Sequence, residues 1–222
     1  MIEIEHLNKT YPLDGRQFKA VDDVSFTIKQ GEFISILGHS GSGKTTLLNL
    51  IGGLTKPNTG TVRIDGQDIW QLKDTELSGL RNEKMNFIFQ FASLIPTLNV
   101  VDNVLLPATF GKVKKADLYD TAVDLLAMMG LSDKLRAYPS QLSGGQQRRV
   151  AISRAFINDP AIILADEPTG DLDEETEQEI ITLFRSFNEK KKTTFLIVTH
   201  SSDLASKTDR RFRMTAGRLE SA

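Results

Sequence analysis

Residues 38–45 constrain the fold of this chain more than any other segment. They read Gly-His-Ser-Gly-Ser-Gly-Lys-Thr, which contains the glycines, lysine and threonine of a phosphate-binding loop. The apolar run 33–37 precedes them, and residues 46–51 follow with the composition of a helix. The pattern predicts a strand, a glycine turn and a helix whose N-terminus faces an anion. A flexible glycine turn with a solvated lysine is the alternative interpretation.

Each residue type in this loop suits a phosphate ligand. Backbone N–H groups of a glycine-rich turn can converge on phosphate oxygens, and the helix start adds partial positive charge. The lysine would reach the β- and γ-phosphates, and the following hydroxyl would hold Mg²⁺. The predicted nucleotide-binding residues here are Gly38, His39, Ser40, Gly41, Ser42, Gly43, Lys44, Thr45 and Thr46, with Lys44 also catalytic and Thr45 also a metal ligand.

Fully apolar runs indicate a buried parallel sheet. Residues 33–37, 162–165 and 195–198 are almost entirely apolar, as expected for strands covered on both faces. The N-terminal residues and residues 60–69 predict antiparallel additions, with Asp65-Gly66 as a hairpin turn. The strands themselves are predicted at residues 33–37, 161–165 and 194–199, and further strands at residues 2–7, 24–28, 61–64 and 87–90.

The stretch from about residue 91 to residue 142 differs from its flanks. It is predicted to be mostly helical, with one helix over 118–129 that ends at Gly130. On both sides strands and helices alternate, and a helix after Asp173 begins with acidic residues and ends with lysines. We therefore expect one nucleotide-binding domain over 1–222, in which residues 1–90 and 143–222 form the α/β core and about 91–142 a helical insertion.

Composition excludes several classes of protein. The chain has no cysteine, so disulfides, thiol catalysis and cysteine-ligated zinc are excluded, and a reducing compartment such as the cytosol is favoured. Lys and Arg number 27 against 29 Asp and Glu, which is not the charge of a dedicated nucleic-acid binder. No apolar run approaches the ~20 residues of a spanning helix. Residues 1–5 alternate apolar and acidic side chains, which predicts a strand and not an export signal.

Two adjacent carboxylates follow the apolar run 162–165. Asp166 and Glu167 lie at the carboxyl end of this predicted strand, where open α/β sheets bind ligands. Asp166 suits a direct or water-mediated Mg²⁺ contact, and Glu167 could orient and deprotonate an attacking water. The alternative is that the pair only caps the next helix.

Residues 142–146, Leu-Ser-Gly-Gly-Gln, precede a second predicted helix. Ser143 as N-cap, followed by Gly144, Gly145 and Gln146, makes another helix start with exposed backbone N–H groups. Taken alone, the segment is better explained as the start of an ordinary capped helix.

These motifs together resemble the ATP-binding cassette family of transporter ATPases. The phosphate loop, Gln90, the Leu-Ser-Gly-Gly-Gln segment, the carboxylate pair, residues 170–173 and His200 occur in the family's order over nearly the whole chain. The resemblance implies an α/β fold: a three-layer P-loop NTPase core of the RecA type, with an antiparallel β subdomain and an inserted α-helical subdomain. Asp171 departs from the small residue often found there, which puts details of the subunit contact in doubt.

The resemblance also implies a mechanism. Such cassettes hydrolyse ATP with Mg²⁺ as head-to-tail homodimers, in which Ser143, Gly144, Gly145 and Gln146 complete the partner's nucleotide site. Tyr11 matches the aromatic residue that stacks on adenine, although it could merely pack against Pro12. Gln90 resembles a residue that contacts Mg²⁺ or water, and His200 a switch histidine on the γ-phosphate; a surface strand end and a structural histidine are the alternatives.

Residues 89–98 and 168–173 resemble one branch of this family, which contains macrolide-efflux, lipoprotein-release and cell-division cassettes. The branch implies an integral membrane permease as partner, a peripheral position on the cytoplasmic face of the membrane, and export or extraction of cargo. A regulatory cassette with slow turnover is one alternative, and a soluble cassette acting on nucleic acid or ribosomes another, although no direct nucleic-acid contact is expected. The basic clusters Lys112, Lys114, Lys115 and Lys190 to Lys192 are interpreted as solvated faces.

Overall fold

A computed structural model describes residues 1–13, 15–111, 114–170 and 172–221. Its centre is a six-stranded sheet with the order β10-β9-β3-β8-β7-β6. The strands from β9 to β6 run parallel to one another, and β10 pairs with β9 in the antiparallel direction. The strands of this sheet are β3 (Phe33–Leu37), β6 (Met85–Ile88), β7 (Ile162–Asp166), β8 (Thr194–Thr199), β9 (Arg210–Thr215) and β10 (Arg218–Ser221). The predicted buried parallel sheet is confirmed.

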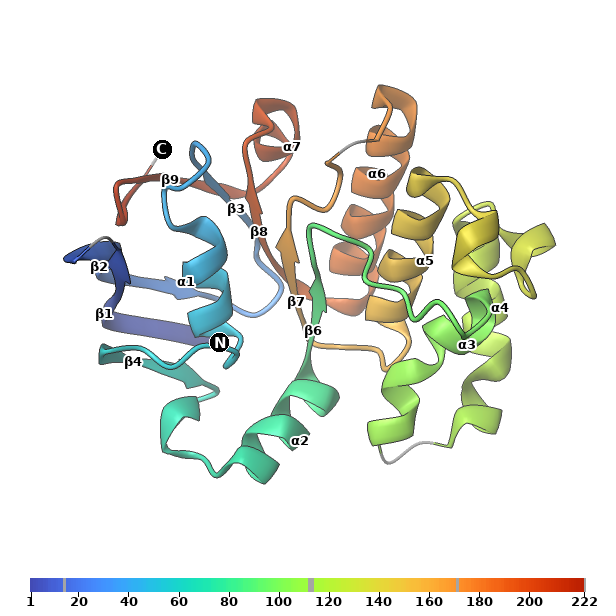
Figure 1. Ribbon diagram of the computed structural model, residues 1–222, viewed down its shortest axis with the longest axis horizontal. Coiled ribbons are helices and arrows are strands. Elements are labelled where there is room, and N and C mark those ends of the chain that lie inside the picture. The colour runs from blue at the N-terminus through green and yellow to red at the C-terminus, as the bar shows by residue number, and fades with distance from the viewer. Residues whose placement is uncertain (14, 112–113, 171, 222) are drawn as a thin grey trace.

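A second, antiparallel sheet lies beside the first, on the left in Figure 1. Its order is β2-β1-β4-β5, with β1 (Ile2–Leu13), β2 (Arg16–Ile28), β4 (Thr59–Ile64) and β5 (Gln67–Asp68). The turn between β4 and β5 has φ of 51° at Asp65 and 81° at Gly66, the positive pair that a tight hairpin requires. The predicted antiparallel additions and their turn are therefore present.

Side chains of the central strands alternate between two hydrophobic cores. Phe33, Phe195 and Ile197 join one core, whereas Ile34 and Leu196 join the other. This two-residue period shows that both faces of the sheet are covered. The antiparallel sheet and α1 (Lys44–Ile51) cover one face, and α5 (Gly144–Phe156) and α6 (Glu174–Lys191) lie on the other, which gives three layers (Figure 1).

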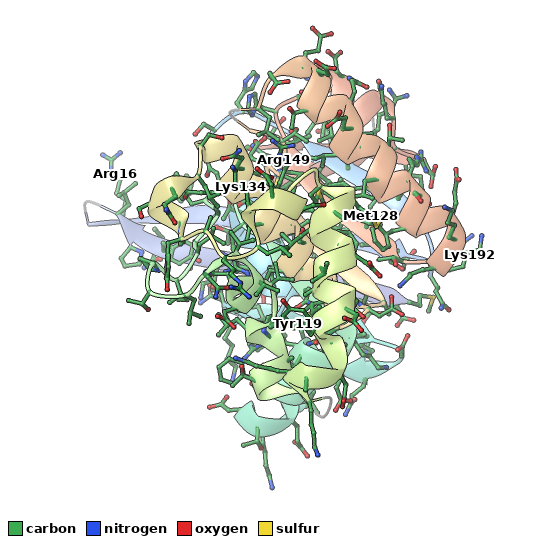
Figure 2. The ribbon with its side chains drawn as sticks, turned by 90° about the vertical axis from the view of Figure 1, so that its right-hand side faces the viewer. Arg16, Tyr119, Met128, Lys134, Arg149 and Lys192 are labelled. Carbon is green, nitrogen blue, oxygen red and sulfur yellow. The ribbon has the colours of Figure 1, made fainter. Side chains whose placement is uncertain are left out.

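The remaining helices are short. They are α2 (Asp74–Lys84), α3 (Val100–Val104), α4 (Tyr119–Met128) and α7 (Ser202–Ser206), with 3₁₀ turns at Ile69–Gln71, Leu106–Phe110, Lys115–Leu118, Ser132–Lys134 and Pro139–Gln141. Figure 2 views the molecule from the side of α4, where Tyr119 and Met128 lie exposed on that helix. Among the described residues, no helix combines the length and apolar composition needed to cross a bilayer.

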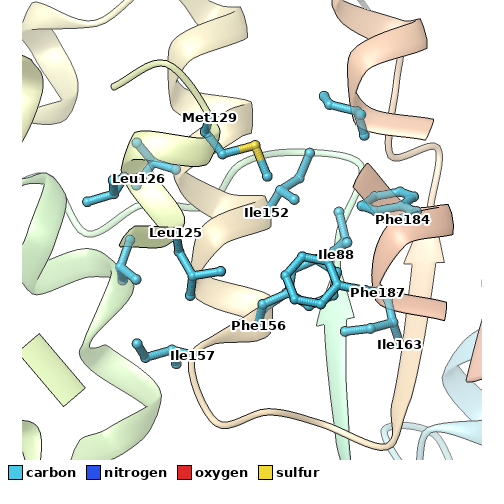
Figure 3. Close-up of a cluster of buried hydrophobic side chains, with 14 of the residues drawn as sticks. Ile88, Leu125, Leu126, Met129, Ile152, Phe156, Ile157, Ile163, Phe184 and Phe187 are labelled. Carbon is cyan, nitrogen blue, oxygen red and sulfur yellow. The ribbon is translucent and has the colours of Figure 1, made fainter. Parts of the chain in front are cut away.

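The helices of residues 91–142 pack on the core through α5. Figure 3 shows Leu125 of α4 and Met129, just after that helix, directed toward Ile152 and Phe156 of α5, with the phenylalanines of α6 beyond. The ring of Phe156 stacks on Phe187, with centroids 4.2 Å apart. The helix carrying the Leu-Ser-Gly-Gly-Gln segment is thus joined by one continuous apolar cluster to the α4 region and to the sheet.

Some predicted boundaries were wrong. The strand predicted at 24–28 begins at Arg16, because polar and exposed residues continue its pairing with β1. The strand predicted at 87–90 covers Met85–Ile88 instead, and Gln90 lies beyond it. Strand β9 was not predicted, because it contains no continuous apolar run. Arginines alternate with its two inward residues, Phe212 and Met214. Lys112 and Asp171, which entered the sequence predictions, lie outside the described residues.

Candidate nucleotide-binding site

The phosphate loop joins β3 to α1, as its sequence predicted. Gly43 caps α1 with φ of 107°, and a Cβ built there would lie 2.0 Å from the carbonyl oxygen of Ala20, so only glycine fits. Lys44 is 8% exposed, and its Nζ donates to the carbonyl oxygens of Gly38 at 2.7 Å and His39 at 3.1 Å. The ammonium group therefore lies over the loop that carries the N–H groups, where a phosphate would meet both.

Asp166 ends β7 beside this loop and is 6% exposed. Burial raises the pKa of its carboxyl group, while a hydrogen bond from the Thr45 side chain lowers it and the nearby Glu167 charge raises it again. A carboxylate that is costly to ionise in this position gains from a bound cation. The Thr45 hydroxyl and the Asp166 carboxylate are oxygen donors of the kind that Mg²⁺ prefers, so the residues present fit that ion.

Glu167 follows Asp166 directly, just beyond the end of β7. Its φ is 46°, a left-handed conformation that is uncommon outside glycine and that clusters at functional sites. Oε2 of Glu167 accepts from the Thr199 hydroxyl at 2.9 Å and from the His200 backbone N–H at 3.3 Å, and lies 3.0 Å from His200 Nδ1. The side chain of Glu167 is 13% exposed and that of His200 73% exposed, so the histidine is open to a ligand.

A cleft of about 1040 Å³ connects these groups. Tyr11 on β1 and Gln90 beyond β6 both line it, and Tyr11 is 37% exposed. Phe18, opposite Tyr11 in the β1–β2 register, lines the cleft as well and was missed by the sequence analysis. Of the predicted site residues, the structure brings the following together around the cleft: Tyr11, His39, Ser40, Gly41, Ser42, Gly43, Lys44, Thr45, Thr46, Gln90, Asp166, Glu167 and His200.

The Leu-Ser-Gly-Gly-Gln segment is not part of this cleft. Ser143 caps α5: its hydroxyl accepts from Gln146 N–H at 3.2 Å, and Gln146 Oε1 accepts from Ser143 N–H at 2.9 Å. The predicted capped helix start is therefore present. Among the described residues that line the cleft, Ser143, Gly144, Gly145 and Gln146 do not occur. The helix starts after Gly43 and after Ser143 therefore do not line the same cleft.

Two arginines of α5 that the sequence analysis missed link this helix to the segment around Gln90. Arg148 donates to the carbonyl oxygen of Phe89 at 2.5 Å, and Arg154 donates to Ala92 at 2.8 Å and Ser93 at 2.9 Å. The backbone on both sides of Gln90 is therefore held by the helix that begins at Ser143. Arginines within a helix carry no local signal for such a distant contact, so only the tertiary structure shows it.

The family profile described as ABC transporter matches residues 21–170. The chain belongs to the ABC transporter family. Over 220 residues it is 40% identical to the lipoprotein-releasing system ATP-binding protein LolD of Bacteroides thetaiotaomicron, with 99% of both chains covered. Over 222 residues it is 41% identical to the macrolide export ATP-binding/permease protein MacB of Syntrophobacter fumaroxidans, of which it spans only 31%.

Solved ABC cassettes share this fold across the whole chain. A dimeric structure of the ATP-binding cassette MJ0796, in a post-hydrolysis state bound to ADP and Pi, matches with a TM-score of 0.93 and 41% identity, covering 100% of this chain and 98% of that one. A second dimeric structure of MJ0796 matches with 42% identity and the same TM-score. The expected ABC cassette fold is confirmed, and the protein is a nucleotide-binding ATPase of this family.

Proposed function

We propose that this ABC ATPase works as a head-to-tail homodimer that drives a separate membrane permease from the cytoplasmic face of the membrane. The observation that carries the proposal is the separation of the two helix starts. The cleft gathers Lys44, Asp166, Glu167 and His200, whereas the N–H groups after Ser143 lie outside it. A second copy placed head to tail would bring those N–H groups to the exposed side of the cleft.

Each cleft residue then has a role in ATP hydrolysis. Tyr11 stacks on adenine, and Lys44 and the loop N–H groups neutralise the phosphates. Glu167 orients the attacking water and accepts its proton, while His200 contacts the γ-phosphate. Gln90 lines the cleft, where it can contact Mg²⁺ or the attacking water.

Mg²⁺, when bound with ATP, would supply positive charge that offsets the negative charge of the phosphates. The Thr45 hydroxyl would bind it directly, and Asp166 directly or through water, with Gln90 as a further oxygen ligand. The raised pKa of Asp166 supports this assignment, because a nearby cation offsets the cost of ionising a buried carboxyl group.

We further propose that residues 1–90 and 143–222 act as the ATPase core and about 91–142 as a helical subdomain that meets the permease. A groove lies between the two parts, and its apolar lining includes Leu54, Phe87, Phe89, Leu106, Pro107 and Phe110, beside polar residues such as Asn82 and Arg154. Phe110 is 75% exposed, and Phe89 in this groove is adjacent to Gln90 in the cleft. A permease segment bound in this groove would contact Phe89, and the next residue, Gln90, lines the nucleotide cleft. A movement at the γ-phosphate could therefore pass to the permease through these two adjacent residues.

The groove can be tested with two exposed phenylalanines. Phe110→Glu should abolish co-purification of the cassette with its permease in detergent, whereas Phe91→Glu, at 73% exposure outside the groove, should not. Equal retention of the permease by both variants would exclude the groove. The relatives with macrolide export and lipoprotein release in their names favour export or extraction as the direction of transport.

The decisive experiment for the function is Glu167→Gln. Turnover should fall by roughly 10²- to 10⁴-fold, the range of positioned acid–base groups. Removing a carboxylate from each closed site also lessens repulsion with the phosphates, so the variant should form a dimer with Mg-ATP and return to monomer with ADP. Size-exclusion chromatography with light scattering measures the molar mass of the variant with Mg-ATP and with ADP.

The matched control is Glu174→Gln, on the exposed start of α6, which should hydrolyse ATP at the wild-type rate. A Glu167→Gln protein with wild-type turnover would remove the catalytic assignment. An inactive Glu167→Gln protein that stays monomeric in saturating Mg-ATP would instead count against the dimer.

A further inference from the structure

Glu177 joins two segments of the site that are far apart in the sequence. It lies one turn into α6 and lines the nucleotide cleft. Its Oε1 accepts from the Thr169 hydroxyl at 3.1 Å and from the Ser201 hydroxyl at 3.3 Å. Thr169 follows Glu167 by two residues, and Ser201 follows His200 directly. One carboxylate oxygen therefore bridges the segment of the proposed base and the segment of the proposed switch histidine.

The bridge continues through hydrogen bonds to Glu167 itself. On one side, the Ser201 backbone N–H donates to the Thr199 hydroxyl at 3.0 Å, and that hydroxyl donates to Glu167 Oε2 at 2.9 Å. On the other side, Thr169 lies within the turn in which Gly170 N–H donates to the Glu167 carbonyl oxygen at 3.1 Å. Hydrogen bonds thus connect Glu177 to Glu167 through Ser201 and Thr199, and Thr169 connects Glu177 to the turn that begins at Glu167.

This network holds Glu167, whose backbone conformation is strained. Glu167 has φ of 46°, which surrounding contacts must maintain. Thr169 and Thr199 are 6% and 1% exposed, so their hydroxyls are held in a buried setting where hydrogen bonds order side chains well. The helix α6 also packs in the main core through Ile180, Ile181 and Phe184, so Glu177 projects from a rigid element.

We infer that Glu177 is a positioning residue for ATP hydrolysis, which holds the Glu167 segment and the His200 segment at a fixed separation. The inference rests on the proposed roles of Glu167 and His200. The required property is the reach of an acceptor oxygen to two hydroxyls, and not negative charge. Glu177 touches neither water nor phosphate in this scheme, so its loss should slow turnover without weakening ATP binding.

Reach and charge can be separated by three substitutions. Glu177→Gln keeps the length and an acceptor oxygen but removes the charge, and Glu177→Asp keeps the charge but shortens the side chain by one methylene. Glu177→Ala removes both. For each full-length variant, kcat and KM for Mg-ATP, the Kd for ATP and the thermal midpoint would be measured, with Glu175→Ala on the exposed face of the same helical turn as control.

We expect Glu177→Asp and Glu177→Ala to lower kcat by about 10-fold with Kd within about 2-fold of wild type, the pattern of a lost transition-state interaction. Glu177→Gln and Glu175→Ala should stay within about 3-fold of wild-type kcat. Wild-type kcat in Glu177→Asp overturns the inference, as does equal loss in Glu177→Gln and Glu177→Asp, or a loss confined to ATP affinity. These contrasts hold even if Glu177→Ala does not fold.

The same variants in a Glu167→Gln background separate this inference from the proposed function. If Glu167→Gln abolishes turnover and forms the ATP-dependent dimer, adding Glu177→Asp should leave that dimer intact, because positioning of the base is then irrelevant. Loss of the dimer in the double variant would assign Glu177 to dimerisation and overturn the positioning role. Failure of Glu167→Gln alone concerns only the proposed function.

Discussion

The Nδ1 atom of His200 lies 3.0 Å from Oε2 of Glu167, although 33 residues separate the two in the chain. The contact follows from strand order, because β7 and β8 are parallel neighbours with Asp166 opposite Val198. Residues just beyond the two strand ends therefore meet at the same edge of the sheet. A γ-phosphate and its attacking water bound there would be within reach of both side chains.

Removing His200 should affect turnover and not binding. For His200→Ala we expect kcat to fall by roughly 10²-fold, the cost of losing one preorganised group at the developing charge. The fold should be unchanged, because this side chain is 73% exposed. His6→Ala is a matched control, since His6 also contacts a carboxylate, Asp23, at 2.8 Å but lies outside the cleft. Equal effects of the two changes on steady-state ATPase rates would contradict the assignment.

Lys44→Ala should weaken ATP binding by at least about 10- to 100-fold, since a charge-assisted hydrogen bond contributes about 1.5–3 kcal/mol. The ammonium group already lies over the loop at 2.7 Å from the Gly38 carbonyl oxygen. Titration with a fluorescent ATP analogue measures the affinity, and the exposed Lys29→Ala is the control. Near-normal affinity in Lys44→Ala would refute its phosphate contact.

Ser143→Arg should separate binding from hydrolysis. An isolated subunit should bind ATP normally, because Ser143 lies outside its own cleft, whereas turnover should fall by roughly 10²-fold or more through the partner's site. Loss of the N-cap should also cost about 1 kcal/mol of stability, so ATP affinity and thermal midpoint are compared with those of Ser132→Arg, on an exposed 3₁₀ turn. Weakened ATP binding by the monomer would contradict the two-subunit site.

Asp166→Asn should stabilise the protein measured without nucleotide at neutral pH. Because burial raises the pKa of Asp166, the folded state binds its proton more tightly than the unfolded chain does. Stability contributed by this group therefore falls as pH rises from the unfolded pKa through the raised folded value. The gain from asparagine should be present above the raised pKa and vanish below the ordinary pKa of an aspartic acid side chain.

Thermal midpoints of wild type and Asp166→Asn between about pH 4 and about pH 8 measure this difference. With saturating Mg-ATP, the difference in thermal midpoint should reverse and wild type should be the more stable protein. Asp166 then faces a cation, so the ligand stabilises wild type more than the variant. A stability gain that does not change with pH would show that burial of the charge is not its cause.

Phe156 is the link between the helix that starts at Ser143 and α6. Its ring is 4% exposed and stacks on Phe187 at 4.2 Å (Figure 3). Phe156→Ala should lower the free energy of unfolding by about 3–5 kcal/mol, as measured in urea. Phe91→Ala, at 73% exposure, should change it by less than about 0.5 kcal/mol. A similar small loss for both would mean that the cluster is not the junction we describe.

Local patterns in the sequence were enough to predict several strands, helices and turns of this molecule. The apolar runs predicted β3 and β8 to the residue, and the charge order predicted the helix after Asp173, which is α6. The glycine and lysine spacing predicted the loop between β3 and α1. These features depend on backbone conformation, side-chain period and helix capping within about ten residues, so the local sequence is enough to predict them.

Contacts between distant segments were decided only by the tertiary structure. The position of Phe18 opposite Tyr11, the arginines of α5 on the backbone around Gln90, and the bridge from Glu177 to Thr169 and Ser201 have no local signature. Strand order and helix packing create them, because they depend on which apolar faces meet. The sequence by itself determined which chemical groups this protein has and which backbone turns carry them; the packing of the two cores on the sheet decided which groups meet, since only burial of those faces brings the strand ends to one edge.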